Sequence, residues 1–200
     1  MGYWETLLPL AGFVTVMTGT PGPNNLMLMA SGANAGFRRS LPHIMGILVG
    51  CQILLLCVAL GLGQLLTRFP QLSLTLRVLG LLFLLYLAWQ LVRHRHTPLR
   101  GDHRGAPLTF WQAALFQWVN PKAWMMMVTA VATYTDPVHF SASLTLVALC
   151  FFFLGLPLIS LWNLGGVALQ GWLQHGRRLG RFNLAMAALL LLSLYPTFMS

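Results

Sequence analysis

Two short polar segments, each containing proline, interrupt apolar stretches of this sequence. The first is Thr20-Pro21-Gly22-Pro23-Asn24-Asn25, and the second is Gln117-Trp118-Val119-Asn120-Pro121-Lys122. Proline has no backbone N–H, so it ends or bends a helix and leaves a carbonyl group without its helical partner. Inside a bilayer, such free backbone groups are tolerated only where they are buried in protein or line a cavity. The two segments therefore predict a polar cavity inside an apolar protein.

The backbone groups freed at these interruptions suit a zwitterionic ligand. Proline at positions 21, 23 and 121 removes the helical hydrogen bonds to the carbonyls of Met17, Gly19 and Gln117. We expect these carbonyls to accept hydrogen bonds from an ammonium group. A new helix after each interruption would point its first amides and the positive end of its dipole at the cavity, where they can bind a carboxylate. These amides belong to Asn24, Asn25, Lys122 and Ala123.

Lys122 is the only lysine in the chain, and it lies in an apolar stretch. A cation at the centre of a bilayer costs about 2.5 to 3.5 kcal/mol on insertion scales, which favours a role in pairing with a substrate carboxylate or in gating. The alternative is that its long stem carries the ammonium to the nearer interface. For the polar side chains of both segments, the alternative is hydrogen bonding between helices. The candidate substrate-binding residues are Thr20, Pro21, Gly22, Pro23, Asn24, Asn25, Gln117, Asn120, Pro121 and Lys122.

The composition around these segments is typical of a polytopic membrane protein. Hydrophobic residues make up 57% of the chain and charged residues 8%, with a mean hydropathy of +0.72, which excludes an ordinary soluble domain. A chain of 200 residues has room for about six spans of about 20 residues and for no separate catalytic domain. We therefore expect a function within the membrane and no enzyme activity. The predicted spans are 4–30, 41–66, 72–92, 109–134, 142–169 and 182–199.

Basic residues are concentrated in alternate connections between the predicted spans. Those after the first, third and fifth spans hold Arg38, Arg39, Arg93, Arg95, Arg100, Arg104, Arg177, Arg178 and Arg181. Cytoplasmic loops carry an excess of lysine and arginine, so we expect these connections in the cytoplasm and both termini on the outer side. The fourth connection has Asp136 and no basic residue. Membrane topology thus explains the net charge of +9, and we expect a lipid bilayer and no nucleic acid as partner.

The two interruptions occupy corresponding places in the two halves of the chain. The topology has the first span running inward and the fourth outward, as in the inverted repeats from which many transporters build a site of broken helices. We predict an all-α protein with a 3+3 inverted repeat and broken helices 1 and 4. It forms a single transmembrane domain over residues 1–200, with halves at about 1–92 and 109–200 and a cytoplasmic basic loop at 93–108.

Glycine spacing predicts close contacts between helices. Gly32 with Gly36 and Gly46 with Gly50 are four residues apart, the spacing that lets two helix backbones approach each other. Packing is the function that we expect for both pairs. Together with the short loops, these glycine-rich helix faces make a homodimer plausible.

An ordered set of motifs resembles the LysE/RhtB family of bacterial amino-acid exporters. The motifs are Thr20-Pro21-Gly22-Pro23-Asn24-Asn25, Gly36-Phe37-Arg38-Arg39, the Gly46 to Gly50 spacing, Asn120-Pro121-Lys122 and Gly180-Arg181-Phe182-Asn183. The resemblance implies a six-helix protein of the bacterial inner membrane that exports amino acids or their derivatives, driven by the proton gradient. The form of the first motif that contains Asn24 is similar to the branch associated with cysteine and O-acetylserine export.

Two other functions remain open at this level. A membrane thiol or electron-transfer protein of the wider superfamily needs a reactive thiol pair, whereas Cys51, Cys57 and Cys150 form no Cys-x-x-Cys motif. A passive channel also permits broken helices and differs from a pump in its inability to move solute uphill. Transport by a cysteine-free variant would exclude the first, and transport against a gradient would exclude the second.

The sequence predicts no cofactor, no metal site and no carboxylate proton relay. The methionines at 125–127 are consecutive on a helix and point in different directions, which disfavours a thioether metal site. The chain has three carboxylates, Glu5, Asp102 and Asp136, and all fall at predicted span ends or in loops. If a proton is exchanged, Lys122 or the ammonium group of the substrate is the candidate carrier.

Overall fold

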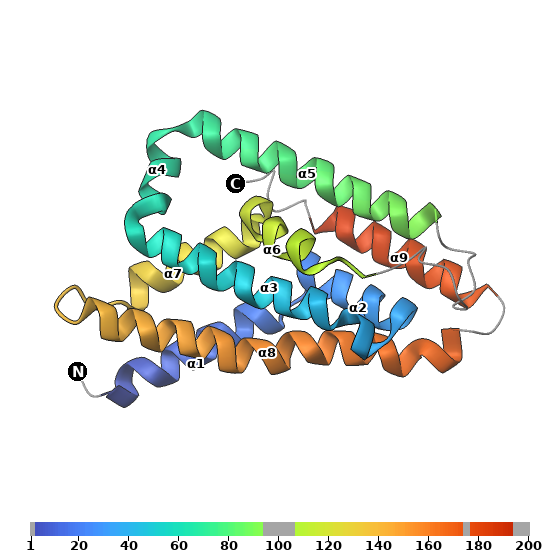
Figure 1. Ribbon diagram of the computed structural model, residues 1–200, viewed down its shortest axis with the longest axis horizontal. Coiled ribbons are helices and arrows are strands. Elements are labelled where there is room, and N and C mark those ends of the chain that lie inside the picture. Colours follow the sequence, from blue (N-terminus) through green and yellow to red (C-terminus); the bar gives the residue numbers. More distant parts are fainter. Residues whose placement is uncertain (1–2, 94–106, 174–176, 194–200) are drawn as a thin grey trace.

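The computed structural model describes residues 3–93, 107–173 and 177–193. Regular structure in these residues is helical throughout, and the longer helices run roughly along one axis of an elongated molecule (Figure 1). This confirms the prediction of an all-α protein. The predicted basic loop at 93–108 lies mostly outside the described residues.

Each predicted span corresponds to one or more helices. The first is divided into α1 (Tyr3–Gly19) and α2 (Pro23–Ala35), and the fourth into α6 (Phe110–Val119) and α7 (Pro121–Tyr134). The second consists of α3 (Phe37–Cys57), the π-helical turn η1 (Val58–Leu62) and α4 (Gly63–Arg68). The remaining helices are α5 (Pro70–Arg93), α8 (Phe140–Leu173) and α9 (Arg178–Leu192). Within the described residues, three stretches are long and apolar enough to cross a membrane, Phe37–Leu62, α5 and α8, and Thr6–Gly19 is a shorter apolar helix.

The interruptions predicted at the two proline segments are present. Pro23 and Pro121 begin α2 and α7, the position where the missing N–H and fixed φ of proline suit a helix start. Both interruptions lie in the middle part of the long axis (Figure 1). Proline alone does not cause them, because Pro157 lies inside α8 without ending it. Before Pro23 and Pro121, Gly22 and Asn120 occupy the N-cap positions of their helices, a type of position that both residues favour.

The second span begins earlier than we predicted. Gly36 has a φ of +82°, a left-handed conformation that glycine adopts easily, and it alone joins α2 to α3. Arg38 and Arg39 therefore belong to the first turn of α3 rather than to a loop. Gly61 has a φ of +100° inside η1, so the same span is also divided near its other end.

Close backbone contacts hold the helices around the interruptions. A Cβ atom on Gly46 would lie 2.3 Å from the carbonyl oxygen of Phe110, and one on Gly50 would lie 2.7 Å from that of Ala114. These glycines pack α3 against α6, as their spacing predicted. In the same way, a Cβ on Gly32 of α2 would lie 2.0 Å from a carbonyl oxygen of α8. At these contacts the backbones of neighbouring helices are so close that only glycine fits. The contacts fix α2 and α6 beside the interruptions.

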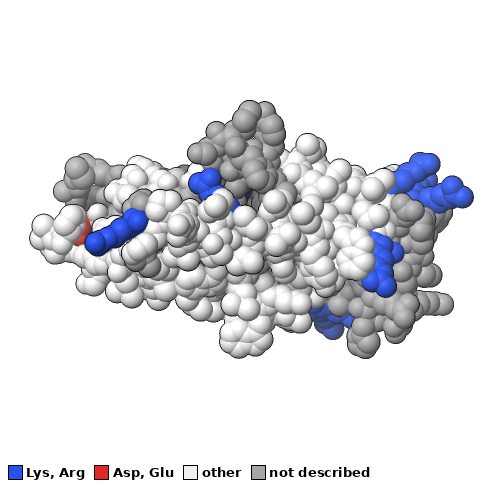
Figure 2. Space-filling view, turned by 90° about the horizontal axis from the view of Figure 1, so that it is seen from above, with Lys and Arg blue, Asp and Glu red and all other residues white. Residues whose placement is uncertain are grey.

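Charge is distributed unevenly along the long axis. Lys and Arg side chains gather where α5 ends and α3 and α9 begin (Figures 1 and 2). The described arginines of these segments are Arg38, Arg39, Arg93, Arg177, Arg178 and Arg181, and we call this end of the molecule the basic end. It contains the described arginines that the sequence assigned to the cytoplasm.

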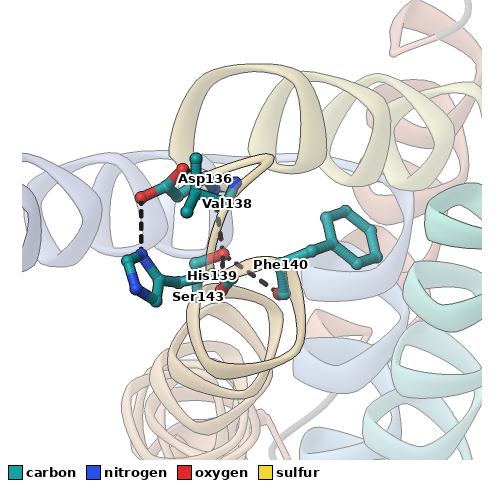
Figure 3. Close-up of polar contacts among 5 residues, drawn as sticks. All are labelled: Asp136, Val138, His139, Phe140 and Ser143. Atoms are coloured by element: carbon teal, nitrogen blue, oxygen red, sulfur yellow. Dashed lines mark hydrogen bonds and ion pairs between the residues drawn. The ribbon is translucent and has the colours of Figure 1, made fainter.

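The turn between α7 and α8 lies at the opposite end (Figure 1). Asp136 Oδ1 accepts a hydrogen bond from the Val138 amide at 2.8 Å, and Oδ2 lies 3.3 Å from His139 Nδ1 (Figure 3). The Asp136 amide donates to Ser143 Oγ at 2.9 Å. The Val138 amide and then His139 hold the pKa of the Asp136 carboxyl below its usual value. The Asp136 carboxylate therefore stabilises this turn through hydrogen bonds to residues of the turn itself.

Candidate functional site

The two interruptions are in direct contact. Asn24 Nδ2 donates to Gln117 Oε1 at 2.8 Å, and Gln117 Nε2 donates to Asn24 Oδ1 at 3.2 Å. Gln117 is fully buried, and its Nε2 also donates to the carbonyl of Ala113 at 2.8 Å. This reciprocal amide pair connects the start of α2 to the end of α6, so the structure brings together the segments that the sequence singled out.

Lys122 makes a second connection between the interruptions. Its Nζ donates to the carbonyl oxygen and to Oγ1 of Thr20, both at 2.9 Å, and the Pro21 carbonyl oxygen lies at 3.5 Å. The stem of Lys122 passes against Gly22, where an added Cβ would lie 3.0 Å from Cδ. The only cation of the two predicted segments therefore points from α7 into the interruption between α1 and α2.

A pocket of about 550 Å³, including its open mouth, adjoins this contact. We call it the central pocket. Its walls come from the interruption between α1 and α2, from α3, from the start of α7 and from α8. The polar side chains that line it belong to Thr18, Asn24, Asn25, Gln52, Asn120 and Lys122, together with the thiol of Cys51. The apolar part of the lining includes Ile47, Leu48, Phe151 and Ile159, which belong to α3 and α8.

The ten predicted residues divide into lining and supporting positions. Gly22, Asn24, Asn25, Asn120 and Lys122 line the central pocket. The others support it: Gln117 binds Asn24, Thr20 and Pro21 hold Lys122, and Pro23 and Pro121 begin the two half-helices.

The carbonyl groups available to a cation differ from those that we predicted. The carbonyl of Gly19 is occupied by Trp162 Nε1 at 3.0 Å, because α8 passes close to the end of α1. The carbonyl of Gln117 accepts from the Asn120 amide at 3.4 Å, and that of Met17 accepts from Thr20 Oγ1 at the same distance. The ammonium of Lys122 instead uses the carbonyls of Thr20 and Pro21, which lie within the interruption itself.

The amide donors are likewise fewer than we predicted. Asn120 caps α7, since its Oδ1 accepts from the Lys122 amide at 3.2 Å and its carbonyl accepts from the Ala123 amide at 3.1 Å. Gly22 has no side chain with which to cap α2. The amides of Asn24 and Asn25 accordingly have no hydrogen-bond partner among the described residues. The start of α2 is the donor site that remains.

The hydroxyl of Thr18 is a second polar group at the central pocket that lacks a partner among the described residues. Thr18 Oγ1 is buried and has no hydrogen-bond partner within the described ranges. The Asn25 side chain is fixed beside it, because Nδ2 donates to the carbonyls of Thr18 and Thr20 at 2.7 and 2.8 Å. The central pocket thus combines unpartnered donors at α2 with carbonyl acceptors that already bind an ammonium group.

Sequence reasoning did not identify the contribution of α3. Cys51 and Gln52 line the central pocket, and Cys51 Sγ lies 3.6 Å from Gln117 Oε1. Gln52 Nε2 donates to the Ala148 carbonyl at 3.0 Å and so joins α3 to α8. The sequence did contain one signal, the amide side chain of Gln52 in an otherwise apolar stretch. Inside a membrane such a side chain needs a hydrogen-bond partner or a polar cavity.

Comparison with known proteins identifies the family to which the chain belongs. Residues 15–195 match the family model described as LysE type translocator. The chain belongs to the LysE translocator family. This LysE-type translocator is 36% identical over 181 residues to the cysteine/O-acetylserine efflux protein of Klebsiella pneumoniae, with 86% of each chain covered. It is 31% identical over 190 residues to the cysteine/O-acetylserine efflux protein of Escherichia coli K12, covering 92% of this chain and 94% of that one.

A further relative is an uncharacterized membrane protein of Pseudomonas aeruginosa, 28% identical over 190 residues, which cover 88% of this chain and 85% of that protein. No solved structure matches the translocator. The family resemblance seen in the motifs is confirmed, and with it a multi-pass membrane protein of a transporter family. Because the functionally named relatives above are efflux proteins, the predicted class of exporter is confirmed at the level of the family.

Proposed function

We propose that this LysE-type translocator exports a small zwitterionic amino acid, such as cysteine or O-acetylserine, and that the central pocket binds it. The observation that carries this proposal is the position of the Lys122 ammonium, bound to Thr20 beside the unpartnered amides of Asn24 and Asn25. An amino acid needs acceptors for its ammonium and donors for its carboxylate. The central pocket offers both within two turns of one interrupted helix.

The contact between Lys122 and Thr20 suggests how the substrate binds. A substrate ammonium has the same hydrogen-bonding chemistry as the lysine ammonium, so it can take the Thr20 carbonyl and hydroxyl when Lys122 leaves them. The substrate carboxylate, bound to the amides at the start of α2, attracts the released Lys122 ammonium. Each charge then has a partner before and after the exchange, as a site inside a membrane requires.

The walls of the central pocket favour a small, uncharged side chain. Ile47, Leu48, Phe151 and Ile159 contribute apolar side chains to its lining. No carboxylate is found among the described residues that line it, so the cationic side chain of a substrate such as lysine would lack a counterion. We therefore infer selectivity for neutral amino acids over basic ones.

The direction of export rests on the charge distribution. We propose that the basic end faces the cytoplasm of a bacterial cell, that both termini lie on the outer side of the inner membrane, and that the two halves form the inverted repeat. The exposed apolar residues of α5, among them Leu74, Leu82 and Trp89, are the face that we assign to lipid or to a second copy in a homodimer. Exchange with protons follows from the family resemblance.

Transport by the purified protein tests this proposal. Proteoliposomes loaded with unlabelled O-acetylserine should take up labelled O-acetylserine by counterflow, whereas liposomes loaded with lysine should not. Uphill movement driven by a pH gradient would separate a pump from a passive channel. If neither cysteine nor O-acetylserine exchanges above the level of protein-free liposomes, the proposed substrate class is wrong.

A further inference from the structure

A second pocket lies farther along α2, toward the basic end, and we call it the basic-end pocket. It encloses about 550 Å³, including its mouth, and its walls come mainly from α2, α3, α5 and α9. Asn24 and Asn25 of α2 line the central pocket, whereas Ser31 and Asn34 line this one. Ten residues of helix separate Asn24 from Asn34, a rise of about 15 Å toward the basic end. One helix therefore connects the two pockets.

The basic-end pocket repeats a feature of the central pocket. Asn34 Nδ2 donates to Asn183 Oδ1 at 2.9 Å, and Asn183 Nδ2 donates to Asn34 Oδ1 at 3.2 Å. This reciprocal amide pair joins α2 to α9, just as the pair of Asn24 and Gln117 joins α2 to α6. Each end of α2 is thus tied by amides to a different neighbour beside a pocket.

His43 is the unusual group in this pocket. It is fully buried, and its Nδ1 lies 3.1 Å from Ser31 Oγ. Its Nε2 has no hydrogen-bond partner among the described residues. A buried polar atom without a partner costs about 1–3 kcal/mol, and where its residue lines a pocket it is a candidate contact for a ligand.

The charges around His43 leave it as the titratable group of the pocket. The described lining contains no Asp, Glu, Lys or Arg. Of the helices that pack on α3 or line the pocket, α2 and α6 have no titratable side chain, and α8 has only Cys150. The charged or titratable residues of α5, α7 and α9 are Arg77, Tyr86, Arg93, Lys122, Tyr134, Arg178 and Arg181, and the others of α3 itself are Arg38, Arg39, Cys51 and Cys57. The arginines among them are exposed, and Lys122 binds Thr20.

We propose that the basic-end pocket is the entry site for the exported amino acid, where the substrate ammonium and a proton compete for Nε2 of His43. This inference rests on the proposed export of zwitterions. When Nδ1–H donates to Ser31 Oγ, Nε2 of the neutral imidazole carries a lone pair. That lone pair accepts a hydrogen bond from an ammonium group or binds one proton, but not both.

This competition couples the export of the amino acid to the import of a proton, without any covalent change in the substrate. In the state of the transport cycle that opens this pocket to the outer side, a proton binds the Nε2 lone pair and forms an imidazolium, which repels an ammonium group. On the cytoplasmic side, this proton leaves to water, and the restored lone pair accepts a hydrogen bond from the arriving substrate. One proton enters for each amino acid that leaves, and no interior carboxylate is needed.

The wild-type protein gives the first test, with O-acetylserine as the probe. Proteoliposomes with equal pH on both sides measure exchange between pH 3.5 and 7.5. Competition predicts that the apparent KM rises as pH falls, because a proton on Nε2 excludes the substrate ammonium. A KM that stays constant over this range overturns the inference. Absence of any exchange at all contradicts the proposed function instead.

The second test uses His43→Gln, which keeps an uncharged polar side chain but cannot bind a proton. Whatever exchange this variant retains at equal pH should lose its pH dependence, while accumulation driven by a pH gradient falls to the level of protein-free liposomes. His139→Gln changes an exposed histidine at the opposite end and serves as the matched control. Gradient-driven accumulation by His43→Gln at the wild-type level overturns the inference. If this variant fails to insert, Ser31→Ala should shift the pH profile of exchange, and an unshifted profile contradicts the inference.

Discussion

Lys122 Nζ lies 2.9 Å from the carbonyl oxygen and 2.9 Å from the hydroxyl of Thr20, residues separated by 102 positions in the chain. The contact joins two interrupted helices from different halves of a LysE-type translocator. It places an ammonium group where the proposed substrate would place its own. In the proposed mechanism, the substrate ammonium replaces that of Lys122 at Thr20, and neither cation is left unpaired.

Replacement of this lysine tests its role in transport. Lys122→Met keeps the long stem and removes the ammonium, so export of O-acetylserine should fall at least tenfold while the protein still inserts into the membrane. Efflux from cells and the amount of protein in the membrane fraction measure the two effects. Arg77→Met removes an exposed cation from α5 and should leave efflux unchanged. Full transport by Lys122→Met would exclude Lys122 from the mechanism.

The amide pair at the contact predicts a coupled effect on stability. Gln117→Leu leaves the Asn24 amide without its partner, and we expect a loss of about 1–3 kcal/mol in the free energy of unfolding. Asn24→Leu should cost a similar amount. The double variant should cost less than the sum of the two, because both single changes break one interaction. Additive losses in denaturant titrations of the detergent-solubilised protein would show that the pair is not coupled.

Close approach of backbones predicts which glycines are essential. Gly46→Val should strongly reduce the amount of folded protein, because its Cβ would lie 2.3 Å from a carbonyl oxygen that cannot move away. Gly12→Val is the matched control, since no atom beyond the adjacent backbone of its own helix lies within 4 Å of its added Cβ. The control should leave the melting temperature near the wild-type value. Fluorescence-detected size exclusion measures both, and equal yields for the two variants would contradict the packing described above.

The turn at Asp136 predicts a pH effect that is separate from transport. The folded protein lowers the pKa of this carboxyl, so the ionised form stabilises the fold above the unfolded pKa of about 3.9. This contribution is lost as pH falls through the folded pKa. Asp136→Asn should therefore reduce the acid dependence of the melting temperature below about pH 4. The variant should export normally at neutral pH, and a loss of export would place the turn in the transport path.

The sequence predicts the interruptions well because their causes are local. Pro23 and Pro121 follow residues that suit an N-cap, and this combination ends one helix and begins the next whatever surrounds it. The same holds for Gly46 and Gly50, whose spacing alone indicates a close helix contact. Family membership could also be inferred, since the motifs occur in order along the chain.

The partners of the freed backbone groups could not be predicted in this way. Trp162 takes the Gly19 carbonyl from a helix more than a hundred residues away, and no local pattern indicates this bond. His43 was overlooked for a related reason. Periodicity cannot show which face of a helix lines a cavity when all of its faces are apolar. The positions of Cys51 and Gln52 at the central pocket follow only from the packing of α3 between α6 and α8.

Equilibrium binding to the purified protein tests the central claim most directly. Isothermal titration should detect binding of O-acetylserine and no binding of two analogues, the methyl ester, which lacks the carboxylate, and the N-acetyl derivative, which lacks the ammonium. This result follows if the Thr20 acceptors and the amides of Asn24 and Asn25 bind the two charges. An analogue that lacks either charge and binds as tightly as O-acetylserine would contradict the assignment of the central pocket.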